Sequence, residues 1–178
     1  NTCLPEMDVQ GNGNSIANND AVPDTADHTD FSGALVNGGT VTRNFTIENS
    51  GARDLLITLP ISIGGAHASD FMVTGQPAST VSASGGTTTF TVEFDPGAMG
   101  TRSAEISIVN DDNDENPYTF AIQGTGATDS VIINEVDADT AGIDTQEFIE
   151  LYDGGIGNTI LNGLVAVFYN GFVDKSYN

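Results

Sequence analysis

The stretch from Asn110 to Asn116 concentrates oxygen-bearing side chains within one short segment. Its carboxylates are Asp111, Asp112, Asp114 and Glu115, and its other members are asparagines. Carboxylate and amide oxygens are the hard donors that Ca²⁺ prefers, but the EF-hand spacing of glycine and bidentate glutamate is absent. The sequence favours a solvated acidic loop whose Asn and Asp side chains bind their own backbone, and Ca²⁺ binding is the alternative.

A second acidic set surrounds the turn Ala141-Gly142 in the C-terminal part of the chain. It comprises Asp137, Asp139, Asp144, Glu147 and Glu150. Glu147 and Glu150 are an odd number of residues apart, so on a strand they face opposite sides and cannot both reach one ion directly. We again expect solvated surface, with a Ca²⁺ site at Asp137, Asp139 and Asp144 as the alternative.

Residues that could form an active site are scarce. His28 and His67 are the only histidines, and the closeness of Ser69 and Asp70 to His67 in sequence does not make the geometry of a catalytic triad. Paired carboxylates act in glycosidases only across a cleft, and chance pairs are expected among 25 Asp and Glu residues. The sequence therefore predicts no enzyme, no catalytic residue and no cofactor other than Ca²⁺.

The charge balance excludes some partners. Four Lys and Arg residues stand against 25 Asp and Glu, giving a formal net charge of -21. Such a chain repels phosphate backbones and anionic lipid surfaces, so nucleic-acid binding is not expected. No apolar run is long enough to insert into a membrane, and residues 1–10 do not form a signal peptide, so we expect a mature segment whose export signal has been removed.

Cys3 is the only cysteine, so it cannot form a disulfide within this chain. We interpret it as a surface thiol whose partner lies outside this segment. A disulfide between two chains is the alternative.

Apolar and polar residues alternate with a period of two along most of the chain, which predicts an all-β protein. In residues 41–48, Val41, Phe45 and Ile47 can face a core, and Arg43 on the same face must lie near a sheet end or pair with a carboxylate. Residues 89–94 and 103–108 show the same alternation, and we expect them to form an antiparallel hairpin around the turn at Pro96-Gly97. Further strands are predicted at 54–64, 70–74 and 118–124, a pattern typical of a β-sandwich.

Small residues from Gly124 to Asp129 mark a predicted domain boundary. The first predicted domain covers residues 1–127. The second covers residues 128–178, with strands expected at 131–136, 147–152 and 163–169.

An ordered series of segments resembles the choice-of-anchor D repeat of bacterial surface proteins, a relative of the immunoglobulin-like domains of abnormal-spindle and hydin proteins. The segments span residues 5–126: 5–13, Asp30-Phe31, 41–51, 68–71, 89–96, 108–112 and 118–126. Phe31-Ser32-Gly33 departs from the more usual Phe-Gly-Ser. The resemblance implies an immunoglobulin-like antiparallel β-sandwich.

Residues 132–137, 147–152 and 164–171 resemble the opening of a lamin-tail domain, another immunoglobulin-like sandwich found on exported bacterial proteins and some extracellular nucleases. Only the first half is matched. Three strands cannot bury both faces or protect both edges, so we expect further chain or a neighbouring subunit to complete this incomplete sandwich, the latter by strand addition.

Together these patterns predict a non-catalytic extracellular module of a bacterial surface or secreted protein, structural or adhesive. One form of this hypothesis is a filament subunit that self-associates through strand edges. One alternative is a non-catalytic appendage of a secreted hydrolase, such as an extracellular nuclease, whose catalytic domain lies elsewhere. Another is a calcium-dependent binding module, although the lack of Trp leaves little for sugar stacking.

Overall fold

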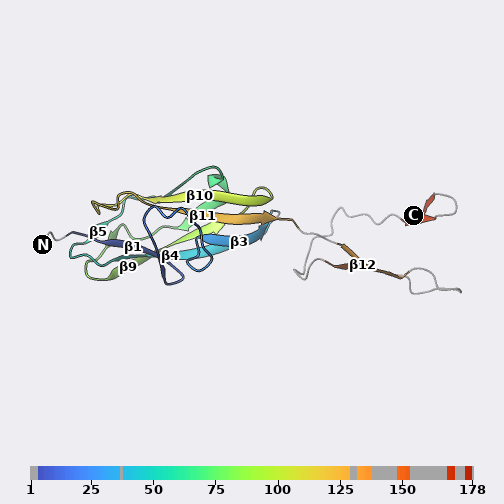
Figure 1. Cartoon of the computed structure of the whole chain (residues 1–178), viewed down its shortest axis with the longest axis horizontal. Helices are drawn as coiled ribbons and strands as arrows, with labels where there is room; N and C mark the ends of the chain where they lie inside the picture. The colour runs from blue at the N-terminus through green and yellow to red at the C-terminus, as the bar shows by residue number, and fades with distance from the viewer. Residues whose placement is uncertain are drawn as a thin grey trace. The chain divides into compact units, whose positions relative to one another are not determined.

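The computed structural model describes residues 4–36, 38–128, 132–137, 148–152, 168–170 and 175–177. The chain divides into two compact units, Asn1–Thr128 (unit 1) and Asp129–Asn178 (unit 2), which are described separately (Figure 1). The predicted site residues Asp139, Asp144 and Glu147, and also Cys3, lie outside the described residues. Within the described segments no helix has the length and apolar character needed to cross a membrane.

Unit 1 is a sandwich of two main sheets, as the alternating pattern predicted (Figure 1). The first has the order β2-β1-β4-β9-β7 and is antiparallel throughout. Its strands are β1 (Met7–Gly11), β2 (Asn14–Ile16), β4 (Val41–Asn49), β7 (Phe71–Gly75) and β9 (Gly86–Phe94). The all-β, immunoglobulin-like sandwich class is therefore confirmed.

The second sheet has the order β3-β11-β10-β6. Its strands are β3 (Asp30–Leu35), β6 (Ser62–Gly64), β10 (Gly100–Ile108) and β11 (Tyr118–Ala127). Strand β3 runs parallel to β11, and the other pairs are antiparallel. A short ladder of β5 (Leu55–Leu56) with β8 (Thr80–Val81) and a 3₁₀ turn at Ala68–Asp70 complete unit 1.

The core lies between the two sheets. The predicted inward residues of β9 and β10 are all buried: Phe90, Val92, Phe94, Ala104, Ile106 and Ile108. Within the first sheet Phe45 stacks on Phe90 with centroids 5.2 Å apart, and across the sandwich Phe45 contacts Phe120 of the second sheet at 5.7 Å. Alternation along each strand thus places one apolar face of each sheet against the other.

The predicted hairpin of residues 89–94 with 103–108 is wrong. Strand β9 pairs with β4 and β7 in one sheet, whereas β10 pairs with β11 and β6 in the other. Both strands present an apolar face to the same core, and the link at residues 95–99 crosses from one sheet to the other. Because packed sheets lie about 10 Å apart, a five-residue link suffices for that crossing.

The single strand predicted over residues 54–64 is divided into β5 and β6. Pro60 lies between them, and a proline has no N–H to donate to a ladder. Ile57 retains one antiparallel bridge to Asn110 before the chain crosses to the edge of the second sheet.

Strands β12 (Ile132–Asp137) and β13 (Phe148–Tyr152) of unit 2 form an antiparallel pair, and β14 (Phe168–Asn170) pairs with β15 (Lys175–Tyr177). The backbone of Asp137 lies opposite Phe148, and Glu150 lies opposite Glu135. The Ca²⁺ site proposed for Asp137, Asp139 and Asp144 stays a prediction, because two of its members lie outside the described residues.

Candidate functional site: an acidic loop at one end of the sandwich

The predicted Ca²⁺ loop connects β10 to β11 at the end of the sandwich where β1 begins. Asn110 is buried and organises it: its Nδ2 donates to the carbonyls of Ile108 and Glu115, and its Oδ1 accepts from the Asp112 N–H at 2.8 Å. The Asn110 N–H donates in turn to Asn116 Oδ1. Asn side chains thus satisfy the loop backbone, as the solvated-loop interpretation predicted.

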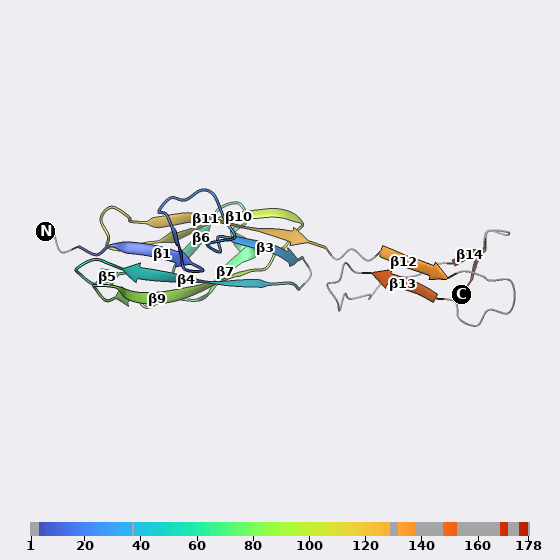
Figure 2. The same ribbon diagram turned by 60° about the horizontal axis from the view of Figure 1, so that its bottom comes forward.

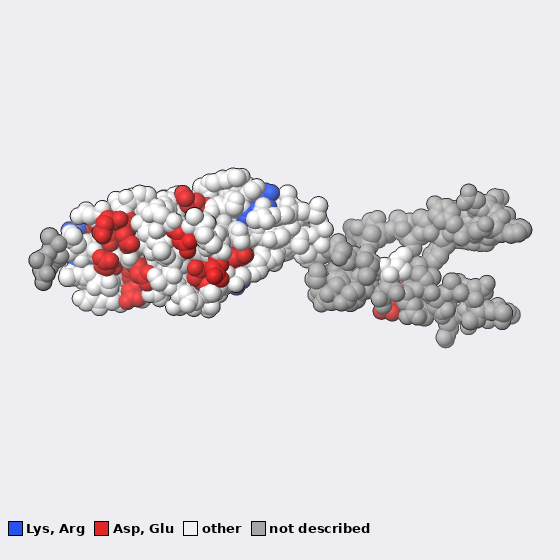
Figure 3. Space-filling view, viewed as in Figure 1, with Lys and Arg blue, Asp and Glu red and all other residues white. Residues whose placement is uncertain are grey.

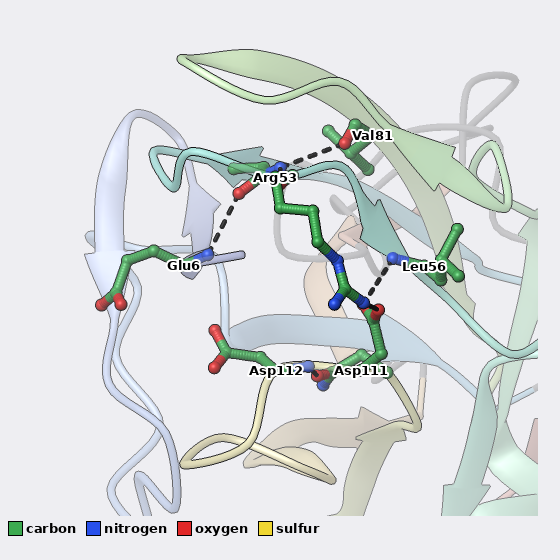
Figure 4. Close-up of polar contacts among 8 residues, drawn as sticks. Glu6, Arg53, Leu56, Val81, Asp111 and Asp112 are labelled. Carbon is green, nitrogen blue, oxygen red and sulfur yellow. Dashed lines mark hydrogen bonds and ion pairs between the residues drawn. The ribbon is translucent and has the colours of Figure 1, made fainter. Parts of the chain in front are cut away.

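The four predicted ligands do not all face one point. The Asp111 carboxylate forms an ion pair with Arg53 and accepts the Leu56 N–H at 2.7 Å. Figure 4 shows Asp111 between these two groups, while the Asp112 carboxylate points away from Arg53 on the side where Glu6 lies. Asp111 is therefore occupied with fixing the loop to the β5 segment.

Asp112 is almost fully enclosed, at 1% exposure. Its Oδ2 accepts the Met7 N–H at 2.9 Å, which ties the loop to the first residue of β1. Its Oδ1 is buried without a hydrogen-bond partner, and Oε2 of Glu115 is buried without one too. Buried carboxylate oxygens normally have partners, so these two are open positions for a proton or a cation.

Negative charge from two parts of the chain meets around Glu115. Burial, followed in order of effect by the charges of Asp112, Glu6, Asp114 and Asp8, raises its pKa to about 7. Burial likewise raises the pKa of Asp112, and the neighbouring Asp114 carboxyl raises it as well. The group of Glu6, Asp8, Asp112, Asp114 and Glu115 is called the acidic group below.

The sequence predicted only three members of this group, Asp112, Asp114 and Glu115. Glu6 and Asp8 lie beside the loop because β1 enters the sandwich next to the start of β11, a neighbourhood that no local pattern reveals. Figure 3 shows acidic side chains spread over one face of unit 1. Across the described residues, no three Asp, Glu, His or Cys side chains converge as ligands of a metal ion, so a cation here would need backbone carbonyl or water oxygens as well.

We expect Glu115→Gln to stabilise unit 1 above neutral pH. Between about pH 4.5 and 7 the folded state holds a proton on Glu115 that the unfolded state has released, so the free energy of unfolding falls as pH rises. Glutamine removes this loss, which is on the order of 1 kcal/mol after allowance for solvent screening. Guanidinium unfolding at pH 5 and pH 8 measures it.

The exposed Glu105 on β10 provides the control. Glu105→Gln should leave the difference in unfolding free energy between pH 5 and pH 8 as in the wild type. Part of the slope should remain in Glu115→Gln, because Asp112 contributes with the same sign. An unchanged slope in Glu115→Gln would contradict the assignment.

The two histidines have structural positions. Nδ1 of His67 accepts the Ser103 N–H at 2.9 Å, so this nitrogen is not available to Ser69 as a base. His28 has a positive φ of 67°, and burial followed by the charge of Arg43 lowers its pKa. Arg43 lies near the start of β4, which is the sheet-end alternative of the sequence prediction.

A second polar site lies near the opposite end of unit 1. Asp70 is 5% exposed, and it forms an ion pair with Arg102 of β10 and accepts the Gly97 N–H. An open pocket of about 180 Å³ adjoins it, lined by Ser69, Asp70, Phe71, Met72, Glu93 and Asp95. Ligand sites for drug-sized molecules are usually larger and mostly apolar, so this pocket does not resemble one.

A model of the HYDIN/CFA65/VesB-like Ig-like domain matches residues 24–125, more than half of the chain. The chain belongs to this family. Membership accounts for the two-sheet sandwich of unit 1 and confirms the immunoglobulin-like part of the resemblance. The choice-of-anchor D and lamin-tail assignments stay predictions.

Several solved structures are similar to this Ig-like chain. A protein of unknown function from Porphyromonas gingivalis W83 has 16% identity and a TM-score of 0.50, over 70% of this chain and 49% of that one. The ASH/PapD-like domain 7 of human CEP192 has 14% identity and a TM-score of 0.46, over 73% and 91%. The VesB protease of Vibrio cholerae has 17% identity and a TM-score of 0.41, over 61% and 31%.

The chain spans about half the length of the Porphyromonas protein. At this identity, the similarity shows the fold alone. No curated protein matches the chain significantly.

Proposed function

We propose that this chain is a non-catalytic extracellular module of a bacterial surface or secreted protein, with unit 1 acting as a structural spacer. The observation that supports this most is where the chain enters and leaves unit 1. Met7 lies beside Asp112 at one end, and Ala127 ends β11 beyond its pairing with Gly100 at the other end. Ten residues of β11 at about 3.3 Å each separate the two ends by roughly 30 Å.

The chemistry of the described residues fits this role. His67 binds the backbone of Ser103, and the pocket beside Asp70 is small and open. The high negative charge suits an extracellular spacer, because it keeps neighbouring molecules apart and soluble.

A domain exchange in the complete protein tests the spacer role. Residues 4–128 are replaced by an unrelated immunoglobulin-like sandwich of similar end-to-end length, and cell attachment and any hydrolase activity of the complete protein are measured. We expect both to be retained, because unit 1 supplies length and not a reaction. Loss of either with a correctly folded replacement would contradict the proposal.

Self-association through strand edges is part of the proposal. Two-stranded pairs are at best marginally stable in water, and the described residues of unit 2 form two such pairs, β12 with β13 and β14 with β15. Added strands from a neighbouring copy would extend them by backbone hydrogen bonding. Light scattering of the pure chain should show a mass that rises with concentration, and a constant monomer mass would contradict it.

The alternative is that the chain is a non-catalytic appendage of a secreted hydrolase. Its family is named in part after VesB, and VesB of Vibrio cholerae is a protease. In that case deletion of residues 4–128 should change the location or substrate access of the enzyme and leave its turnover of a small soluble substrate intact.

The acidic group supports a second candidate function, weak Ca²⁺ binding. Unpartnered oxygens on Asp112 and Glu115 lie among several further carboxylates, and a divalent cation would relieve both the lost hydrogen bonds and the repulsion. Calorimetry of the full chain with CaCl₂ should show binding with a dissociation constant of about 0.1–1 mM, the range of extracellular modules.

Matched variants make the calcium test specific. Asp112→Asn with Glu115→Gln should abolish the heat of binding, whereas Asp111→Asn should retain it, because Asp111 is engaged by Arg53 and Leu56. Absence of heat in the wild type at millimolar CaCl₂ would end this candidate.

A further inference from the structure

Strands β1 and β11 are the first and last strands of unit 1, and they run in the same direction. Met7 lies opposite Asn49, and Tyr118 lies opposite Ile108, so both strands begin at the end that holds the acidic loop. Figure 2 shows the chain entering at this end and leaving from β11 at the other. Tension that separates Leu4 from Thr128 therefore acts along the axes of both strands.

Strand β11 is hydrogen-bonded along both edges. On one side it pairs with β10 in unbroken register from Ile108↔Tyr118 to Gly100↔Gly126. On the other side residues 19–20 and 29–36 bond to it, and β3 runs parallel to it with one register shift. Their backbone bonds are Asn19 N–H to Thr119 O at 2.7 Å, Ala121 N–H to Asp20 O at 2.7 Å, Gln123 N–H to Thr29 O at 3.0 Å and Val36 N–H to Ala127 O at 2.8 Å.

Strand β1 is also held on both edges, over a shorter length. It pairs with β4 from Met7↔Asn49 to Gly11↔Phe45, and with β2 from Val9↔Ile16 to Gly11↔Asn14. The contacts continue toward the N-terminus, where Leu4 O accepts the Ala52 N–H at 3.0 Å and Glu6 O accepts the Ser50 N–H at 2.9 Å. The Met7 N–H donates to Asp112 in the loop that joins β10 to β11 of the other sheet.

We propose that unit 1 is built to carry tension between its two ends. Ladder hydrogen bonds lie nearly perpendicular to the strands, so a pull along β1 and β11 loads many bonds at once in shear. A pull that separates neighbouring strand ends instead breaks the bonds one after another. The inference rests on the proposed spacer function, because a spacer fixed at both sides is the element that transmits force.

The weaker of the two attachments should fail first. Strand β1 has fewer paired residues than β11, which is also covered by residues 19–36. We therefore expect the first event under tension to be release of β1 together with β2, since β2 pairs only with β1 in its sheet. Loss of β11 follows and unfolds the sandwich.

Single-molecule force spectroscopy on the full chain compares two directions of pulling. In the first, handles are attached to Cys3 and to Thr128→Cys. In the second, Cys3→Ser removes the native thiol, and handles are attached to Ala98→Cys and Thr128→Cys. Ala98 is exposed, and its carbonyl lies beside Gly126, so this second pull separates β10 and β11 from their adjacent ends.

We expect the end-to-end pull to need at least about twofold more force at the same loading rate, because forced unfolding depends on the barrier along the direction of pulling. Both variants should have the same free energy of unfolding in guanidinium. A difference in unfolding force between them then reflects only the direction of pulling. Equal or lower force in the end-to-end pull would overturn the inference. That outcome leaves the spacer proposal standing, whereas failure of the domain exchange removes the spacer proposal without changing either force.

Discussion

Replacing Phe31 with alanine is expected to lower the free energy of unfolding by about 3–5 kcal/mol. The Phe31 side chain is fully buried, and its ring contacts three others from the opposite sheet. The ring centroids lie 5.5 Å from Phe71, 6.1 Å from Phe94 and 6.4 Å from Phe45. Truncation removes the transfer free energy of the ring, the aromatic contacts and the support of the surrounding cavity.

Urea or guanidinium unfolding measures this loss. Val22→Ala is the matched control, because Val22 is 74% exposed and its truncation should change the free energy by no more than about 0.5 kcal/mol. A single domain has about 5–15 kcal/mol of stability in total, so Phe31→Ala should remove a large share of it. A loss smaller than about 1.5 kcal/mol would mean that the two sheets do not meet at Phe31.

The Arg102→Met variant is expected to lose about 3–5 kcal/mol, because it leaves the buried Asp70 carboxylate without its partner. Arg102 lies on β10 of the second sheet, and Asp70 ends the 3₁₀ turn that precedes β7 of the first. Both are next to the link at residues 95–99, where Asp70 O also accepts the Asp95 N–H at 2.8 Å. An unpaired charge at this position destabilises both sides of the link. Chemical unfolding at pH 7 gives the loss.

Two further variants show whether the lost unfolding free energy comes from burial of the Asp70 charge or from the loss of any ion pair. Arg53→Met breaks an exposed ion pair with Asp111 and should cost no more than about 1 kcal/mol. The double variant Asp70→Leu/Arg102→Met should recover part of the loss, because apolar replacement of a whole buried pair is often neutral. If Arg102→Met costs no more than Arg53→Met, the Asp70 site does not contribute to stability as a buried pair.

Local patterns predicted which faces of the strands are buried, but not which strands are neighbours. The alternation in residues 89–94 and 103–108 correctly placed Phe90 and Ile106 in the core. The same alternation is equally compatible with a hairpin and with two strands on opposite sheets, because both arrangements bury the same face. Strand β9 pairs with β4, which lies far away in the sequence.

The N-terminal strands were underpredicted for a different reason. Asn12-Gly13 joins β1 to β2, with φ of 51° and 76°, and an Asn-Gly pair is a strong signal for a two-residue hairpin. The polar residues of the short strand β2 masked this signal. Its only apolar residue, Ile16, is fully buried.

The sequence predicted the composition of the candidate site but not the contacts of its carboxylates. The oxygen-rich composition of residues 110–116 was evident, and the role of Asn110 in binding the loop backbone follows from the known behaviour of asparagine. The different partners of the Asp111 and Asp112 carboxylates were not predictable, because Arg53 and Met7 come from two other parts of the chain.

Labelling of intact cells tests whether this Ig-like chain is an extracellular spacer. In the complete protein, Cys3 and any other cysteine are replaced by serine, and Thr128→Cys introduces a thiol at the exposed end of unit 1. A maleimide that cannot cross membranes should label Thr128→Cys on intact cells as fully as after lysis. Labelling that occurs only after lysis would contradict the claim.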